Sequence, residues 1–290
     1  MSLYRFKTFR TSYFFPRMRK ELEFMYGLYP TYGGKLSRIY WWLFRHCSMV
    51  RALNACEGEK AGFPYHKIVN LEGKDSLMAF NLGTPGPEQK ISILGFDAGK
   101  KEPFFAKFSE KPDAIKLTRN EVTTYQVLNG TNLAPELYEV KEQDDCIWMR
   151  TSFVQGKHLA SMALTKETVE LAVTLSKYHL SDKITNDEGL QLSLSHGDFC
   201  PWNMLVNDGN LQLIDWEMAA DRPLGYDIFK YVCQISLLFT PEKPLIDAIK
   251  ENQALINNYF YQCGIDDWNA YRDEFLKEFA VYFDRKISHN

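Results

Sequence analysis

Asn203 and Asp215 flank a predicted β-hairpin. The dipeptide at 208–209 is Asp-Gly, a strong turn signal when short apolar runs lie on both sides of it. With the turn centred there, residues 204–206 pair with residues 211–214, and Asp215 should lie roughly 5 to 8 Å from Asn203. The hairpin therefore brings an amide and a carboxylate together.

Asp198 is a third polar side chain that reaches the same place. It precedes Asn203 on a loop in which Pro201 prevents a helix interior. Two carboxylates and an amide provide the oxygen ligands that Mg²⁺ prefers, and one Asp can orient an attacking hydroxyl, so the set suits phosphoryl transfer. The alternative is a loop of solvated polar residues, in which Asp198 caps a turn and His196 is a buried structural histidine.

The order of these residues resembles a known family. His196-Gly197-Asp198, then Asn203, then Ile214-Asp215-Trp216-Glu217 is similar to the motifs of the aminoglycoside phosphotransferase and choline kinase family. The resemblance implies an α+β, two-lobed protein-kinase-like fold. Its small N-lobe is built on an antiparallel sheet, and its larger C-lobe is mostly helical.

The resemblance also assigns roles and cofactors. ATP or another nucleoside triphosphate would be the donor, with Mg²⁺ held by Asn203 and Asp215. Asp198 would accept the proton of the acceptor hydroxyl, and His196 would hold the loop. Glu217 would assist the metal or the acceptor.

A Gly/Pro-rich loop at residues 82–89 joins two strand-like runs, 76–81 and 90–96. Related kinases place such a loop over the nucleotide phosphates. Gly83, Thr84 and Gly86 are therefore the candidates for phosphate contact. Two prolines in the loop remove amide donors and the pattern is not GxGxxG, so a plain turn is the alternative.

Lys107 lies inside the short strand expected at 103–108, and Glu121 falls on the apolar face of the helix expected at 113–129. A carboxylate in that position is costly unless it is paired, so Lys107 is its expected partner. The pair resembles the Lys and Glu that kinases use to position phosphates. The alternative is a surface Lys and a boundary Glu, the latter paired with Lys116 or Arg119.

The resemblance extends to the lobe boundaries. Residues 146–157 would form a strand and hinge, with backbone groups near Arg150 and Ser152 at the adenine edge. The expected parts are an N-terminal extension (1–64), an N-lobe (65–153) and a C-lobe (154–290). Further helices are expected at 166–180, 245–263 and 268–283. Another helix opens near Asp227, a residue that often braces the catalytic loop in this family.

Composition narrows the classes of protein. The chain has 290 residues, of which 45% are apolar, so it can bury a large core. It has no membrane-length apolar run, no signal-peptide pattern and no paired cysteine motif, which indicates a cytoplasmic protein with reduced thiols.

The spacing from Asp215 to Asp227 argues against a protein kinase. Its twelve positions are too few for the activation segment that holds a peptide substrate. No motif specifies an oligomeric state.

Charge is divided unevenly along the chain. Residues 1–51 carry ten Lys or Arg against two Glu, a net charge of +8, whereas the remainder carries −11. The acidic remainder makes nucleic acid a poor partner. Fourteen of the 42 aromatic residues also lie in residues 1–51. This segment is either helices packed on the body or on a partner chain, or an arm that binds a membrane surface, which would make the protein peripheral to a membrane.

The sequence therefore predicts an ATP- and Mg²⁺-dependent kinase that phosphorylates a hydroxyl of a small molecule. Amino alcohols, sugars, glycolipid headgroups and aminoglycosides are the acceptor classes that this prediction covers. The alternative function is a catalytically silent kinase fold that acts as a binding or scaffold module. The prolines at 85 and 87 favour that alternative, and the intact Asp198, Asn203 and Asp215 oppose it.

Overall fold

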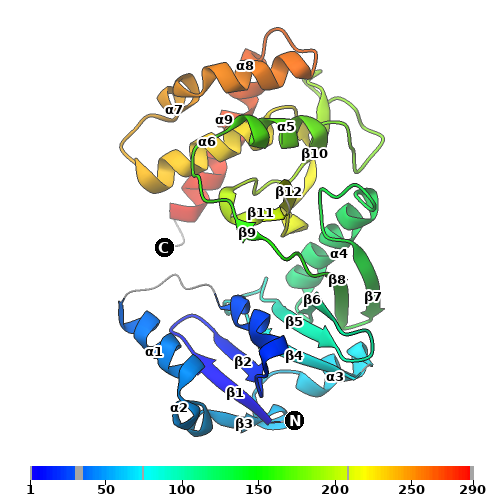
Figure 1. Ribbon diagram of the computed structural model, residues 1–290. Helices are drawn as coiled ribbons and strands as arrows, with labels where there is room; N and C mark the ends of the chain where they lie inside the picture. Colours follow the sequence, from blue (N-terminus) through cyan, green and yellow to red (C-terminus); the bar gives the residue numbers. More distant parts are fainter. Residues whose placement is uncertain (1, 30–34, 74, 208, 288–290) are drawn as a thin grey trace. The chain divides into compact units, whose positions relative to one another are not determined.

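The structure is a computed structural model that describes residues 2–29, 35–73, 75–207 and 209–287, with side chains described as far as residue 279. The chain forms two compact units (Figure 1). The first comprises residues 1–122 and 136–153, and the second comprises residues 123–135 and 154–290. The first is built on an antiparallel sheet and the second is mainly helical, so the mixed α+β class expected from the sequence is confirmed.

The first unit contains strands, α-helices and two 3-10 segments. In chain order they are β1 (Ser2–Lys7), β2 (Ser12–Pro16), η1 (Lys20–Leu28), α1 (Lys35–His46), α2 (Ser48–Leu53), β3 (Ala55–Glu57), η2 (Gly58–Lys60), α3 (Tyr65–Glu72), β4 (Ser76–Asn81), β5 (Ile91–Asp97), β6 (Glu102–Ser109), α4 (Pro112–Val127), β7 (Leu137–Gln143) and β8 (Cys146–Ser152). α4 continues into the second unit.

The strands of the first unit form an eight-stranded sheet in the order β3-β1-β2-β4-β5-β6-β8-β7. The strands predicted around residues 76–81, 90–96, 103–108 and 146–152 are present as β4, β5, β6 and β8. The N-terminal segment differs from the expected helices on the body: it begins with strands that join the sheet, through pairs such as Phe14 with Phe80. η1 and α1 follow these strands.

Alternation along the strands buries both faces of this sheet, because successive side chains point to opposite sides. Phe80 and Ile93 face a cluster that includes Ile68 of α3. Their neighbours Ala79 and Leu94 face a second cluster, which also contains the η1 residues Leu22 and Met25 and the α1 residues Trp41 and Phe44. Most of the described aromatic residues of the N-terminal segment are thus part of the core of the first unit, and Phe9 and Trp42 are exposed.

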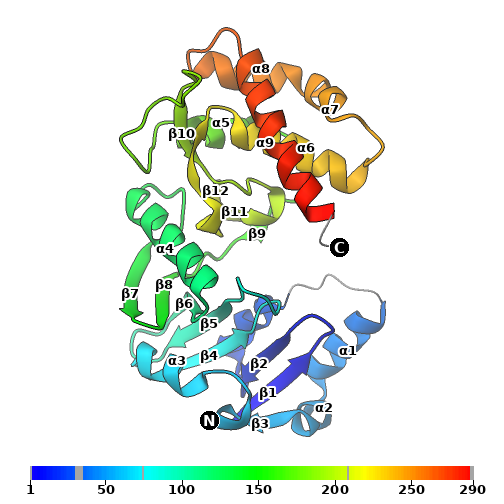
Figure 2. The same cartoon turned by 180° about the vertical axis from the view of Figure 1, so that it is seen from behind.

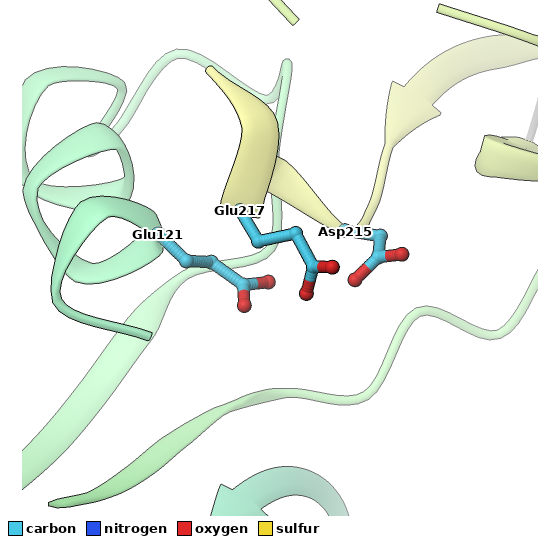
Figure 3. A group of neighbouring side chains, drawn as sticks. All are labelled: Glu121, Asp215 and Glu217. Atoms are coloured by element: carbon cyan, nitrogen blue, oxygen red, sulfur yellow. The ribbon is translucent and has the colours of Figure 1, made fainter. Parts of the chain in front are cut away.

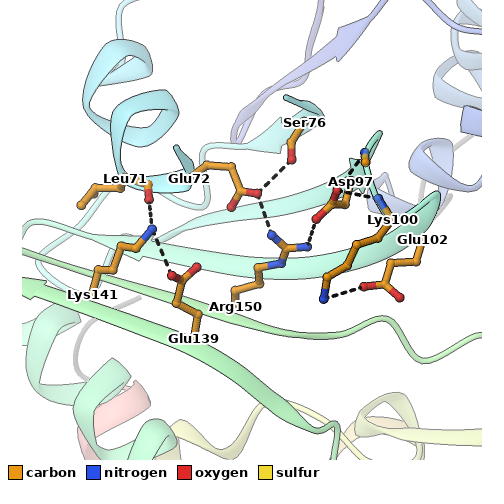
Figure 4. A network of polar contacts seen from close by, with 10 residues as sticks. Leu71, Glu72, Ser76, Asp97, Lys100, Glu102, Glu139, Lys141 and Arg150 are labelled. Carbon is orange, nitrogen blue, oxygen red and sulfur yellow. Dashed lines mark hydrogen bonds and ion pairs between the residues drawn. The ribbon is translucent and has the colours of Figure 1, made fainter. Parts of the chain in front are cut away.

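Arg150 occupies the interior of this unit (Figure 4). Its guanidinium donates hydrogen bonds to Glu72 Oε1 at 2.7 Å and to Asp97 Oδ2 at 3.0 Å, and all three residues are buried. The ring of Phe104 packs against the guanidinium, 4.0 Å from Cζ to the ring centroid. The side chain of Arg150 therefore has a structural part in the sheet, whereas the expectation for its backbone at the adenine edge stays a prediction.

The second unit combines a short hairpin with helices (Figure 2). Its elements are β9 (Lys157–His158), α5 (Lys166–Leu175), β10 (Leu192–Ser195), η3 (Pro201–Asn203), β11 (Met204–Asn207), β12 (Asn210–Leu213), η4 (Trp216–Met218), β13 (Ala220–Pro223), α6 (Tyr226–Phe239), α7 (Leu245–Glu251), α8 (Gln253–Gln262) and α9 (Asn269–Ile287). α5 begins at a Thr165–Thr168 capping box and ends before the predicted residue 180. No helix in the described ranges combines the length and apolar character required to cross a membrane.

Candidate functional site

The predicted hairpin in the second unit is confirmed. β11 and β12 pair in the register Met204 with Leu213 and Asn207 with Asn210. The pairing continues past the strands, because the Ile214 amide donates to the Asn203 carbonyl at 3.0 Å. Asp208, half of the predicted turn, lies outside the described residues. The hairpin thus places Asp215 one residue beyond a hydrogen bond to Asn203, and the 5 to 8 Å separation of the two side chains stays a prediction.

Asp198 and Asn203 are in direct contact. Asn203 Nδ2 donates to Asp198 Oδ2 at 2.9 Å and to the Asp198 carbonyl at 2.9 Å. The amide nitrogen is therefore used to hold the catalytic candidate, and the amide oxygen is the atom left for another ligand. Asp198 is partly exposed, while Asn203 is buried.

Cys200 also supports Asp198, and the sequence reasoning missed it. Its thiol is buried and donates to Asp198 Oδ1 across 3.8 Å. Burial first, and then the neighbouring Asp198 carboxylate, raise the pKa of this thiol far above its ordinary value, so it stays protonated and remains a weak donor. Its position two residues after Asp198 was the only available sequence signal.

His196 holds the loop, as expected from the resemblance. It is fully buried, its Nδ1 accepts from the Asp198 amide at 3.2 Å, and its Nε2 lies 3.0 Å from the Ile214 carbonyl. Because Nδ1 acts as an acceptor, the proton is assigned to Nε2, which donates to that carbonyl. The ring thereby ties the Asp198 loop to the end of the hairpin, and it packs 4.5 Å from the Trp216 ring, centroid to centroid.

Gly197 has a backbone that only glycine suits. Its φ is +78°, and a Cβ at this position would lie 2.2 Å from the Met218 carbonyl oxygen. The close approach brings the loop against the segment that carries Glu217. Any larger residue at position 197, for example arginine, would collide with the backbone of Met218.

Asp227 braces the same loop from the first turn of α6. Its Oδ1 accepts from Ser195 Oγ at 2.7 Å and from the Gly197 amide at 3.1 Å, and its Oδ2 accepts from the His196 amide at 2.7 Å. The carboxylate is buried, so these donors replace water around it. The structural part expected for Asp227 is present, with Ser195 as a partner that the sequence did not reveal.

Replacing Asp227 with asparagine should lower the free energy of unfolding by about 1–3 kcal/mol, because the loss of charge weakens three hydrogen bonds and turns an NH₂ group towards donors. Urea unfolding measures this change. Asp247→Asn, in the first turn of α7 and less buried, is the control and should cost under about 0.5 kcal/mol. Equal losses in the two variants would contradict the bracing role.

Asp215 and Glu217 follow β12, and their carboxylate oxygens lie within 4.8 Å of each other (Figure 3). Asp215 has φ +71° and ψ +58°, a left-handed conformation that is uncommon outside glycine and directs its side chain differently from the preceding strand. The two carboxylates are oxygen donors of the kind that a magnesium ion prefers, and Asn203 offers an amide oxygen. Asn203, Asp215 and Glu217 are therefore the candidate ligands, and the distance of Asn203 from the two carboxylates stays a prediction.

The first unit contains the Lys107–Glu121 pair. Lys107 Nζ donates to both carboxylate oxygens of Glu121, at 2.9 and 2.7 Å, and both side chains are buried. Arg119, considered as an alternative partner, binds Glu142 at 2.7 Å. The contact predicted between the strand and the helix is confirmed, and its part in phosphate binding stays a prediction.

Hydrogen bonds with neighbouring residues hold the β4–β5 loop in the same unit. The Gly83 amide donates to Asn81 Oδ1 at 3.0 Å, and Lys111 Nζ donates to the Gly86 carbonyl at 2.7 Å. Gly83 and Thr84 also line a wide cavity of about 1150 Å³, together with Arg10 and other residues of the β1–β2 turn. Phosphate contact by Gly83, Thr84 and Gly86 therefore stays a prediction. The place of Ser152 at the adenine edge also stays a prediction; its backbone amide and its hydroxyl group both bind the backbone of Glu136.

Two known proteins are similar to parts of this chain. The chain is 23% identical over 198 residues to methylthioribose kinase of Escherichia coli O45:K1 (strain S88 / ExPEC). That alignment covers 67% of this chain and 40% of the relative, so the chain spans about two fifths of the length of the curated relative it matches. A crystal structure of aminoglycoside-3'-phosphotransferase of type VIII is 15% identical, with a TM-score of 0.44, and the match covers 61% of this chain and 82% of that one.

The segment that carries the site matches a family as well. Residues 179–260, which include the Asp198 loop, the hairpin and the start of α6, match the APH family, described as the phosphotransferase enzyme family. The resemblance of this chain to the aminoglycoside phosphotransferase family, inferred from His196 to Glu217, is therefore confirmed.

Proposed function

We propose that this protein is an ATP- and Mg²⁺-dependent phosphotransferase with a two-lobed kinase-like fold that phosphorylates a hydroxyl of a small molecule. The observation that carries the proposal is the geometry at Asp198: a partly exposed carboxylate whose Oδ2 is held by the amide of Asn203. The match of residues 179–260 to a phosphotransferase family supports the same reaction class. The acceptors considered are an amino alcohol, a sugar, a glycolipid headgroup or an aminoglycoside.

Asp198 is the group that acts on the acceptor. Its carboxylate would orient the hydroxyl and accept its proton as the bond to phosphorus forms. The hydrogen bond from Asn203 fixes one carboxylate oxygen, and the thiol of Cys200 contacts the other. His196 and Asp227 keep the loop in place, so the orientation is set before the acceptor arrives.

The phosphate end of the nucleotide requires positive charge. Mg²⁺, when bound, would neutralise phosphate oxygens, and Asn203, Asp215 and Glu217 would hold it. In the first unit, the buried carboxylate of Glu121 fixes the ammonium group of Lys107, which suits a lysine that contacts phosphate.

Asp215→Asn tests the metal part of the proposal. The variant should lower ADP release at least about a hundredfold at low Mg²⁺, and part of the loss should be recovered at high Mg²⁺, because one anionic ligand is gone. The measurement is Mg²⁺-dependent ADP release over a panel of hydroxyl acceptors. Asp266→Asn, on an exposed loop, is the control and should behave as the parent protein does. An equal Mg²⁺ requirement in the two variants would count against Asp215 as a ligand.

A catalytically silent scaffold is the second candidate function. The loop at 82–89 favours it, because the Gly83 amide is already bonded to the side chain of Asn81 at the end of β4 and two prolines supply no amide proton. On this view the protein binds nucleotide, measured by equilibrium titration, but releases no ADP with any acceptor. Turnover that depends on both acceptor and Mg²⁺ would exclude the scaffold.

A further inference from the structure

Helix α1 (Lys35–His46) is apolar on two sides. Trp41 and Phe44 point into the core of the first unit. Four other apolar residues of the helix face solvent with exposed fractions of 83%, 56%, 59% and 36%, and we call them the α1 stripe: Leu36, Ile39, Trp42 and Leu43. Positions three and seven residues apart lie on one side of a helix, so the stripe is a continuous surface rather than scattered exposure.

The turn between β1 and β2 extends this surface. Phe9 is fully exposed there, next to Arg10. Both residues line the same cavity as Leu36. At the start of α1, the apolar side chains of Phe9 and Leu36 therefore lie near the cationic side chain of Arg10.

A basic pocket lies at the other end of α1. It is a cavity of about 440 Å³ with five basic residues and one carboxylate, that of Glu23, among its lining residues; we call the five the basic pocket: Arg19, Lys20, Arg45, His46 and Arg51. The pocket and the α1 stripe touch, because the Trp42 ring lies 5.3 Å from the His46 ring, centroid to centroid.

Two arginines of the basic pocket are held in place by the protein. The guanidinium of Arg45 lies over the Tyr26 ring at 4.9 Å, and its buried Nε has no hydrogen-bond partner among the described residues. Arg51 donates to the carbonyls of Phe44, at 3.1 Å, and of Arg45. Arg19 and Lys20 are exposed at the rim. Guanidinium groups that the protein holds in place suit a phosphate group.

We propose that the first unit binds an anionic membrane surface, with the α1 stripe in the headgroup region and a lipid phosphate in the basic pocket. Tryptophan and aliphatic side chains beside Lys and Arg are the combination that interfacial helices use. The charge distribution fits this orientation, since residues 1–51 carry +8 and an anionic surface repels the remainder at −11. The inference is independent of the phosphotransferase reaction.

Vesicle flotation with the full-length chain tests the proposal, without nucleotide or acceptor. The protein should float with vesicles of phosphatidylcholine and phosphatidylglycerol and stay behind with phosphatidylcholine alone. Raising the salt concentration from about 0.1 M to about 0.5 M should release most of it, because screening weakens exposed charge pairs. Equal flotation with both kinds of vesicle, or with neither, would overturn the proposal.

Two sets of substitutions separate the contributions. The triple variant Leu36→Ser, Ile39→Ser, Leu43→Ser and the double variant Arg19→Glu, Lys20→Glu should each weaken vesicle binding about tenfold or more. All five positions are exposed, so the fold should be retained. Matched controls in the second unit, Leu238→Ser with Phe239→Ser and Lys183→Glu with Lys277→Glu, alter exposed residues of the same kinds and should bind as the parent protein does.

Other occupants of this surface would produce different results. Titration of inorganic phosphate that saturates the basic pocket, with no flotation on anionic vesicles, would replace the membrane with a soluble phosphate compound. Self-association that the serine variant abolishes, again with no flotation, would show that the α1 stripe contacts a second copy of this chain. Either result overturns the proposal as stated.

Discussion

Asp198→Asn should lower turnover about a thousandfold or more, because an amide cannot accept the proton of the acceptor hydroxyl. The substitution preserves size, and the new amide oxygen can still accept from Asn203 Nδ2, which donates to Asp198 Oδ2 at 2.9 Å in the parent chain. Loop geometry and nucleotide affinity should therefore change little. The measurement is ADP release at saturating nucleotide, beside nucleotide binding at equilibrium.

The control for Asp198 is Asp182→Asn, on an exposed loop of the same unit, which should retain the parent activity. If the Asp198 variant keeps more than about a tenth of the activity, Asp198 is not the proton acceptor. Loss of activity together with loss of nucleotide affinity would indicate a disturbed fold instead. Near-ultraviolet circular dichroism distinguishes a disturbed fold from the loss of the proton acceptor alone, because only a disturbed fold changes the spectrum.

Arg150→Met should have the largest effect on stability, a loss of about 3–5 kcal/mol in the free energy of unfolding. The change leaves the carboxylates of Glu72 and Asp97 buried without their cation, while methionine keeps an apolar contact with Phe104. The measurement is urea unfolding followed by circular dichroism.

Arg119→Met is the matched control for Arg150. Arg119 also belongs to an Arg–Glu pair of the first unit, with Glu142, but both side chains are largely exposed. Its loss should cost under about 1 kcal/mol. Adding Glu72→Gln to Arg150→Met should recover part of the stability, because it removes one of the stranded charges. Equal losses for Arg150→Met and Arg119→Met would show that the buried network contributes little.

Contacts among the candidate site residues were predictable where chemistry and local geometry coincided. The Asp-Gly signal between apolar runs predicted the register of the hairpin, and so the position of Asn203 opposite Ile214. The Lys107–Glu121 contact followed from the cost of burying an unpaired carboxylate. In both cases a short-range rule was sufficient.

The N-terminal strands were not predictable in the same way. Tyr13, Phe14 and Phe15 are all buried, so β2 shows no alternation of polar and apolar residues. Its partner β4 lies far away in the sequence, and long-range pairing leaves no local signal. Aromatic and basic residues alternate at positions 4–7 of β1, but the aromatic density of the whole segment drew attention to a helical or membrane-bound arm.

The second miss was the network around Arg150. Glu72 closes α3, Asp97 closes β5 and Arg150 lies in β8, so three separate elements converge on one ion cluster. Each residue taken alone has the character of an ordinary surface charge. Only the packed sheet reveals that they share one interior position.

The position of β2 between β1 and β4 affects how the chain is made. A ribosome completes β2 at residue 16 but reaches β4 only at residue 76, and at about 5–20 residues per second this interval lasts about 3–12 s. Both edges of the nascent hairpin are unsatisfied until β3 is made, and the β2 edge stays so until β4 is made, which favours pairing with other chains. The yield of folded protein should therefore depend on translation speed and chaperone supply more than on the stability of the finished sheet.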